Sequence, residues 1–171
     1  GKRIKIIGHF LLTLILMKWQ LILLLLLISG GYAGCSKKQS GFAKEPHIEY
    51  RGISTRRIQA GSSKDTLFIS FRFRDGDADL GNDATSGNYD IFLTDERDGM
   101  LYTFFFPRIS DDVRNPERGM EGECTFFLLG AFITLRPDHP DLDTVRYSLY
   151  IRDRAGNQSN TVYTEDVYLS Q

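Results

Sequence analysis

The chain has 171 residues, of which 42% are hydrophobic and 25% are charged, and its formal net charge is −1. This composition is typical of one globular domain with a short additional segment, and no second core is needed. All 22 acidic residues follow Cys35, so the main part of the chain is acidic. Because binding to phosphates needs clustered positive charge, we exclude nucleic acid as a partner.

The N-terminal segment contains the longest apolar run of the chain. Leu21 to Ile28 is unbroken by any polar residue, Lys18 precedes it, and the small residues Ser29 to Gly31 follow it. A basic residue, an apolar run and a small-residue region in this order are typical of a secretory signal peptide. We therefore predict a helical signal peptide over residues 1–34.

Two other interpretations of this segment concern its length. Phe10 to Met17 and Leu21 to Ile28 could together form one transmembrane helix, since about 20 apolar residues span a bilayer. Lys18 would then lie near the middle, where a charge costs about 2.5 to 3.5 kcal/mol. Alternatively, Met17 is the true start and residues 1–16 are an over-extended translation. We favour this last interpretation, because Gly1 is not an initiator residue.

A short motif follows the apolar run. Tyr32-Ala33-Gly34-Cys35 resembles the lipobox of bacterial lipoprotein precursors, although Tyr32 stands where that family usually has leucine. The resemblance implies that Cys35 is acylated and becomes the first residue of the mature protein. Several acyl chains make a durable membrane anchor, whereas one chain binds reversibly. The alternative is a plain secretory signal with a cysteine near its end by chance.

Residues 35–45 are small and polar and show no periodicity, which indicates a flexible tether. Ser36 resembles the outer-membrane sorting residue of Gram-negative lipoproteins. No acidic cluster of the kind that marks surface export in Bacteroidota follows Cys35 directly. We therefore expect a cell-envelope protein that is lipid-anchored in the outer membrane and faces the periplasm rather than the cell surface.

From Pro46 onwards, apolar residues recur with a period of two, as in half-buried β-strands. Thr66 to Arg74 is the clearest case, because its apolar residues alternate with polar ones along most of its length. We predict an all-β domain over residues 46–171, built as a seven-stranded antiparallel β-sandwich. The expected strands are His47–Ile53, Thr66–Arg74, Asn88–Thr94, Leu101–Pro107, Glu123–Leu135, Thr144–Asp153 and Asn160–Leu169.

Asp143 to Leu149 resembles the tyrosine corner of immunoglobulin-like domains, with Tyr147 as its structural tyrosine. This resemblance implies an immunoglobulin-like or fibronectin-III-like sandwich in which the Tyr147 hydroxyl bonds to upstream backbone. Leu149 stands where an antibody domain has its second cysteine, and the only tryptophan is Trp19. These departures exclude a true antibody-type domain. A chance match in another antiparallel sandwich is the alternative.

The best candidate for a functional site is the loop Asp75-Gly76-Asp77-Ala78-Asp79-Leu80-Gly81. Carboxylates at alternate positions of a glycine-containing loop can present several oxygens to a hard cation such as Ca²⁺. The loop is not an EF-hand, because Leu80 replaces its turn glycine and Ser86 replaces its bidentate glutamate. A solvated turn without an ion is the alternative.

The predicted sandwich brings further oxygen ligands to this loop. Loops between alternate strand pairs lie at the same end of such a fold. We therefore expect Asp153 to join Asp75, Asp77 and Asp79 as a metal ligand, with Asn157, Asp111 and Asp112 as further candidates. The D-G-D-x-D-L-G loop and the strand before it also resemble a family of uncharacterised Bacteroidota lipoproteins, which implies no particular activity.

The remaining candidates for chemistry are isolated. Cys124 lies in an apolar strand, which indicates a buried structural thiol, and His47 and His139 are far apart in the sequence. The usual metalloprotease, hydrolase and nucleotide-binding motifs are missing. Two segments, Leu101–Phe106 and Phe126–Leu129, have apolar residues at both odd and even positions, and so on both faces of a strand. This indicates strands covered on both faces or an aromatic patch for a partner.

We therefore expect a non-catalytic module that binds or scaffolds an unknown envelope protein. An accessory glycan-binding or adhesion lipoprotein is the alternative, and a metal-dependent enzyme is the least favoured class.

Overall fold

A computed structural model describes residues 41–110, 112 and 114–171. The predicted signal peptide, Cys35 and most of the tether lie outside these residues. The described part is all-β, as predicted, because its only helices are two short 3₁₀ turns, Ala84–Ser86 and Gly130–Phe132. Neither turn has the length and apolarity needed to cross a bilayer.

Ten strands occur in the described part of the chain. They are β1 (His47–Ile53), β2 (Arg57–Gln59), β3 (Thr66–Asp75), β4 (Ile91–Asp95), β5 (Leu101–Phe104), β6 (Met120–Leu129), β7 (Leu142–Val145), β8 (Tyr147–Ile151), β9 (Val162–Tyr163) and β10 (Val167–Ser170).

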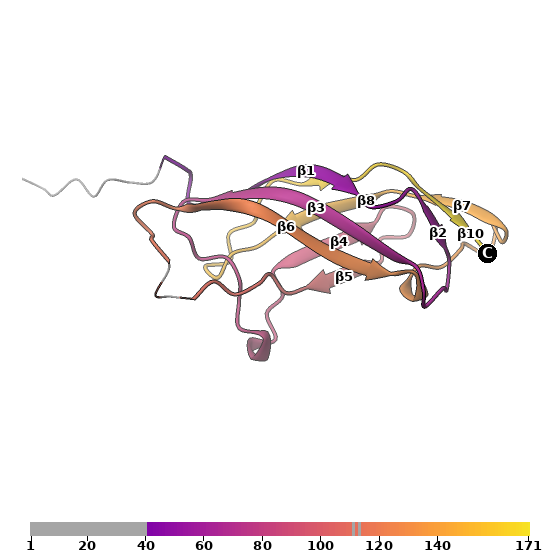
Figure 1. Ribbon diagram of the computed structural model, residues 1–171, viewed down its shortest axis with the longest axis horizontal. Helices are drawn as coiled ribbons and strands as arrows, with labels where there is room; N and C mark the ends of the chain where they lie inside the picture. The colour runs from indigo at the N-terminus through magenta and orange to yellow at the C-terminus, as the bar shows by residue number, and fades with distance from the viewer. Residues whose placement is uncertain (1–40, 111, 113) are drawn as a thin grey trace, which may run out of the picture. The chain divides into compact units, whose positions relative to one another are not determined.

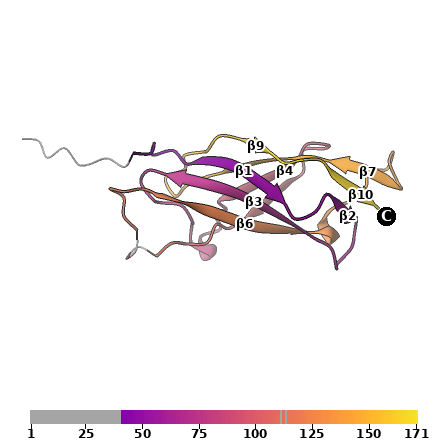
Figure 2. The ribbon, with the colours of Figure 1, turned by 45° about the horizontal axis from the view of Figure 1, so that its top comes forward.

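The strands form three hydrogen-bonded sheets, with the orders β1-β3-β6, β5-β4-β8-β9 and β2-β10-β7. Neighbouring strands are antiparallel except β2, which runs parallel to β10. Both ribbon views show β1, β3 and β6 in one layer and β4 and β8 in a layer behind it (Figures 1 and 2). The chain therefore folds as a sandwich-like arrangement of two layers.

One hydrophobic core lies between the layers. The alternation predicted for β3 is confirmed, since Leu67, Ile69 and Phe71 are fully buried. The ring of Phe126 on β6 contacts the ring of Phe104 on β5, with centroids 4.8 Å apart, and so links the two layers. Such ring pairs add about 0.5 to 1.5 kcal/mol to the free energy gained by burial alone.

The chain breaks two of the predicted strands, which accounts for most of the difference between seven and ten. The Tyr147 N–H donates to Thr164 Oγ1 at 3.0 Å, and the Thr164 N–H donates to the Tyr147 carbonyl at 2.9 Å. At this point the chain changes partners, because β7 pairs with β10 whereas β8 pairs with β4 and β9. The tenth strand, β2, is too short for a period of two to predict it.

Tyr147 lies at the start of β8 and is fully buried. Its hydroxyl has no hydrogen-bond partner among the described residues, so the backbone bond that the tyrosine-corner resemblance implies is not formed. Burial raises the pKa of this phenol. The ring instead packs edge-on against Tyr102, with centroids 6.4 Å apart. Tyr147 therefore contributes to the fold through packing.

A buried ionic network joins the β4–β5 turn to β7. The Arg97 guanidinium donates to Asp95 at 2.7 Å and to Asp143 at 2.6 Å. Arg136 adds a two-point contact to Asp143, from Nη2 at 2.7 Å and Nε at 3.0 Å. These bonds, with that from Arg136 as the largest cause, hold the pKa of Asp143 well below its usual range. The network therefore holds Asp143 as an anion.

Candidate metal centre

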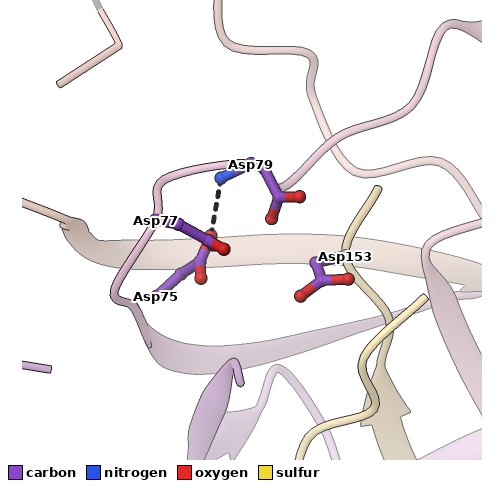
Figure 3. Close-up of side chains that lie close together, drawn as sticks. All are labelled: Asp75, Asp77, Asp79 and Asp153. Carbon is purple, nitrogen blue, oxygen red and sulfur yellow. Dashed lines mark hydrogen bonds between the residues drawn. The ribbon is translucent and has the colours of Figure 1, made fainter. Parts of the chain in front are cut away.

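Asp75, Asp77, Asp79 and Asp153 come together at one end of the domain. Asp75 is the last residue of β3, and Asp153 follows β8, which belongs to the other layer. Each side chain offers one carboxylate oxygen, and these four oxygens lie within 4.8 Å of one another. Figure 3 shows the carboxylates of the loop and of Asp153 gathered around one space. The four residues predicted as metal ligands therefore lie close together.

The loop after β3 is folded by its own first carboxylate. The Asp79 N–H donates to Asp75 Oδ2 at 2.8 Å, which closes the turn between them (Figure 3). Ala78 has a positive φ of 58°, a left-handed conformation that is uncommon for a residue other than glycine. Arg114 Nε donates to the Ala78 carbonyl at 2.6 Å and supports this conformation. The turn therefore directs its carboxylates towards Asp153, and the left-handed conformation of Ala78 is the cost of this arrangement.

A second turn holds Asp153. The Asn157 backbone N–H donates to Asp153 Oδ1 at 2.7 Å, and the Asn157 side-chain amide donates to Oδ2 at 2.8 Å. The Ala155 N–H donates to Asp79 Oδ2 at 3.2 Å, so the two turns are bonded to each other. Asn157 thus orients Asp153 through both its backbone and its side-chain N–H groups.

The electrostatics of the cluster are unbalanced. Asp75 is 0% exposed and Asp153 is 2% exposed. One oxygen each of Asp75, Asp77 and Asp79 is buried without a hydrogen-bond partner. No basic side chain in the described residues forms an ion pair with any of the four. A buried acceptor without a partner costs about 1 to 3 kcal/mol, and more when it is charged. Protons or a bound cation are therefore needed to compensate the buried negative charge of the cluster.

The pKa values of the cluster reflect this imbalance. Burial, above all, and the neighbouring carboxylates raise the pKa of Asp75 to about 7, while the Asp79 N–H opposes the shift. Burial, followed by the charges of Asp153 and Asp77, raises the pKa of Asp79 to about 6. Without a cation, the folded chain thus holds protons that an unfolded chain would release.

We expect the metal-free protein to lose stability as the pH rises. A carboxylate whose folded pKa is raised stabilises the fold below its unfolded value of 3.8, and this stabilisation disappears as the pH passes about 6 to 7. Urea denaturation in a chelator at about pH 5 and about pH 8 measures the effect. Higher stability at the alkaline pH would contradict it. The variant Asp75→Asn, which cannot ionise, should show a weaker dependence.

Phe42 and Ala43 pack directly on the acidic loop, so the prediction of a flexible tether over residues 35–45 is wrong for these two residues. A Cβ added to Gly76 would lie 2.3 Å from the Ala43 carbonyl oxygen and 2.6 Å from that of Phe42. The Phe42 ring lies 5.9 Å from the Arg74 guanidinium carbon, on the strand that leads into the loop. The loop therefore positions the entry of the chain into the domain as well as its own carboxylates.

We expect Gly76→Ala to destabilise the protein by about 1 to 3 kcal/mol, because both clashing atoms belong to the backbone and can only move with the chain. Gly41→Ala is a matched control, since a Cβ at Gly41 meets nothing within 4 Å. Chemical denaturation of the two variants measures the difference. Equal stabilities would show that the contact with residues 42 and 43 is not tight.

The other residues singled out in the sequence lie apart from the centre. Asp112 is exposed and bonds to Ser110, and Asp111 lies outside the described residues. Cys124 is buried in β6, and burial raises the pKa of its thiol to about 11, as expected for a structural cysteine. Phe127 is 52% exposed and Leu101 is 50% exposed, so their strands are not covered on both faces.

Comparisons with known proteins leave the family of the chain open. No family model matches the chain, and no curated protein matches it. Among solved structures, the crystal structure of Spo0M, a sporulation control protein from Bacillus subtilis, is similar at 13% identity with a TM-score of 0.35. The match covers 75% of this chain and 51% of that protein, so it spans about half the length of Spo0M.

Proposed function

We propose that this protein is a lipid-anchored module of the cell envelope, whose sandwich binds or scaffolds a partner and is braced by one Ca²⁺ ion. The observation that carries the cation is the set of buried carboxylate oxygens without hydrogen-bond partners in Asp75, Asp77 and Asp79. Those oxygens would coordinate an ion at that place directly. It would also offset the effects of burial and of the neighbouring carboxylates, which raise the pKa of Asp75.

Ca²⁺ suits the cluster better than other common cations. All four candidate ligands are carboxylates, and hard oxygen ligands are those that Ca²⁺ prefers. Zinc and copper favour histidine and cysteine, neither of which belongs to the cluster. Mg²⁺ requires near-ideal octahedral geometry and retains several waters, which is hard to reconcile with the burial of Asp75 and Asp153.

The role of the ion is structural in this proposal. Asp75 ends a strand of one layer and Asp153 follows a strand of the other, so a shared ion would tie the layers together. We therefore propose a non-catalytic protein.

Within the all-β class, we propose an immunoglobulin-like or fibronectin-III-like sandwich. Strand pairing supports this assignment, because β1-β3-β6 and β5-β4-β8-β9 correspond to the two sheets expected of such a fold. If β7 and β8 count as one strand interrupted at Arg146, and β9 and β10 as another, the number of strands falls to eight. The short β2, parallel to β10, is then an extension of the first strand.

The anchor is tested by mass spectrometry of the mature protein isolated from membranes of its bacterial host. We expect an N-terminal peptide that begins with Cys35 and carries the added mass of its acyl chains. Treatment with a lipase should remove the ester-linked part of that mass. An unmodified Cys35, or a chain that continues through residues 1–34, would contradict the lipid anchor and the outer-membrane location proposed with it.

A second candidate function is that of an accessory glycan-binding or adhesion lipoprotein. Exposed aromatic rings favour it, because such rings offer flat apolar faces for sugars while Tyr adds a hydroxyl. The most exposed in the described residues are Phe127, Phe132, Tyr163 and Tyr168, each at least half exposed. Glycan binding and pull-down of protein partners from the same membranes would distinguish the two functions.

A further inference from the structure

A groove of about 740 Å³ lies over the sheet formed by β2, β10 and β7. The strand register places Arg57, Tyr168 and Thr144 side by side in one row across this sheet. Ser170 and Leu142 face each other in the next row on the same face. These five side chains are exposed, while the residues between them, Ile58, Asp143 and Leu169, are buried. The groove therefore has a flat floor with Tyr168 in its centre.

One wall of the groove is a guanidinium fixed in place. Arg136 is held by its two-point contact with the buried carboxylate of Asp143, which also receives Arg97. The Nη1 group of Arg136 makes no hydrogen bond within the described residues and remains available to a ligand. Because Asp143 already fixes the orientation of Arg136, a ligand would pay little conformational entropy to use it.

The charges of the groove favour an anion. Arg97 and Arg136 are balanced by the carboxylates of Asp95 and Asp143. The guanidinium of Arg57 forms no ion pair in the described part of the chain, so its positive charge is uncompensated. Guanidinium groups bind carboxylates in a planar, two-point geometry. Both Arg57 and Arg136 line the groove, and Arg57 is suited to bind a carboxylate.

The position of the groove on a sheet face argues against an extended peptide. Peptides that add a strand need a free sheet edge, and in this sheet only the outer strands β2 and β7 offer one, because β10 is paired on both sides. A ligand that lies over Tyr168 of β10 therefore contacts side chains. They offer one aromatic ring, the hydroxyls of Thr144 and Ser170, and the guanidinium of Arg57. This combination matches a sugar ring that carries hydroxyls and a carboxylate.

We propose that this groove binds an acidic saccharide, with the Tyr168 ring under a sugar ring and Arg57 on its carboxylate. Figure 1 shows β2, β7 and β10 at the end of the domain away from residues 41–46, through which the chain enters it. The groove therefore lies at the end of the domain opposite residues 41–46. This inference rests on the proposed binding role, and it names the ligand class of that role.

Calorimetric titration of the full chain, purified in detergent, tests the groove with tetragalacturonate and with its methyl ester. We expect the acid to bind more tightly than the ester. Arg57→Gln should weaken binding of the acid by at least about tenfold and leave the ester unchanged, since it removes one charge-assisted contact. Tyr168→Ala should weaken both ligands. The exposed residues Arg118 and Tyr89 supply matched controls, and Arg118→Gln and Tyr89→Ala should bind as the wild type does.

Three results would overturn the assignment. The first is no binding of tetragalacturonate up to about 10 mM, beyond the weak end of specific affinities. The second is binding that Arg57→Gln leaves unchanged, a variant whose exposed side chain is not needed for folding. The third is equal binding of a hexaglutamate peptide, which would show that the groove recognises charge alone. None of these results bears on the Cys35 mass or on Ca²⁺ binding, so the proposed anchor and cation are tested separately.

Discussion

Replacing Arg97 with methionine is expected to lower the free energy of unfolding by about 3 to 5 kcal/mol, the usual cost of breaking a buried ion pair from one side. The Arg97 side chain is 7% exposed and contacts two carboxylates that are themselves almost completely buried. Asp143 would keep Arg136, but Asp95 would lose its cation. Urea denaturation followed by circular dichroism measures the change.

Arg72→Met is the matched control for this variant. Arg72 pairs with Glu121 at 2.8 Å, but its side chain is 42% exposed and its partner is 49% exposed. Exposed pairs contribute only about 0 to 1 kcal/mol, because water screens the charges. We therefore expect a much smaller loss in the control. Similar losses in the two variants would show that the Arg97 network is not the stabilising element that its burial indicates.

We expect the substitution Asp75→Asn to affect thermal stability in opposite ways with and without Ca²⁺. In a chelator, Asp75→Asn should melt at or above the temperature of the wild type, because it removes a buried charge from the cluster. The bond from the Asp79 N–H can persist, since asparagine keeps an acceptor oxygen at that position. At a Ca²⁺ concentration 100 times the dissociation constant, the wild type should gain about 2.7 kcal/mol, and the variant should gain little.

Thermal melting of both proteins with and without Ca²⁺ checks this reversal. Asp138→Asn serves as the control, because Asp138 is an exposed carboxylate outside the cluster. It should respond to Ca²⁺ as the wild type does. An equal response of Asp75→Asn and the wild type would place the ion elsewhere. No response in any of the three proteins would contradict a bound cation.

The sequence was sufficient to predict the layers and the acidic loop, because both depend on local patterns. The alternation in β3 identified its buried face, and the spacing of Asp75, Asp77 and Asp79 is visible within five residues. Asp153 is distant in sequence, but two loops at one end of a sandwich must lie close together. Its place in the cluster therefore followed from the fold class.

The features that the sequence did not predict depend on contacts between distant residues. The break between β7 and β8 arises from the bonds between Tyr147 and Thr164, which are 17 residues apart. The contact between Arg97 and Asp143 spans 46 residues, and neither residue stands out locally. Arg57 and Tyr168 are neighbours because β2 and β10 pair in parallel. The sequence did not predict this either, because no periodicity indicates which strands pair.

The tyrosine corner shows the limit of a motif. Its sequence pattern correctly indicated a large residue at the start of a buried strand. The hydrogen bond implied by the pattern also requires an upstream carbonyl within reach of the hydroxyl, and none of the described residues supplies one to Tyr147. A sequence motif can thus predict the burial and the ring packing of a residue correctly and still fail to predict its hydrogen bond.

Calorimetric titration of chelator-treated protein with CaCl₂ measures whether the acidic cluster binds a cation. The cluster of Asp75, Asp77, Asp79 and Asp153 predicts one ion per chain, released protons at neutral pH, and loss of binding in Asp75→Asn. The released protons come from Asp75, whose pKa of about 7 falls when the ion binds. No heat and no proton release up to millimolar Ca²⁺, or unchanged binding in Asp75→Asn, would contradict it.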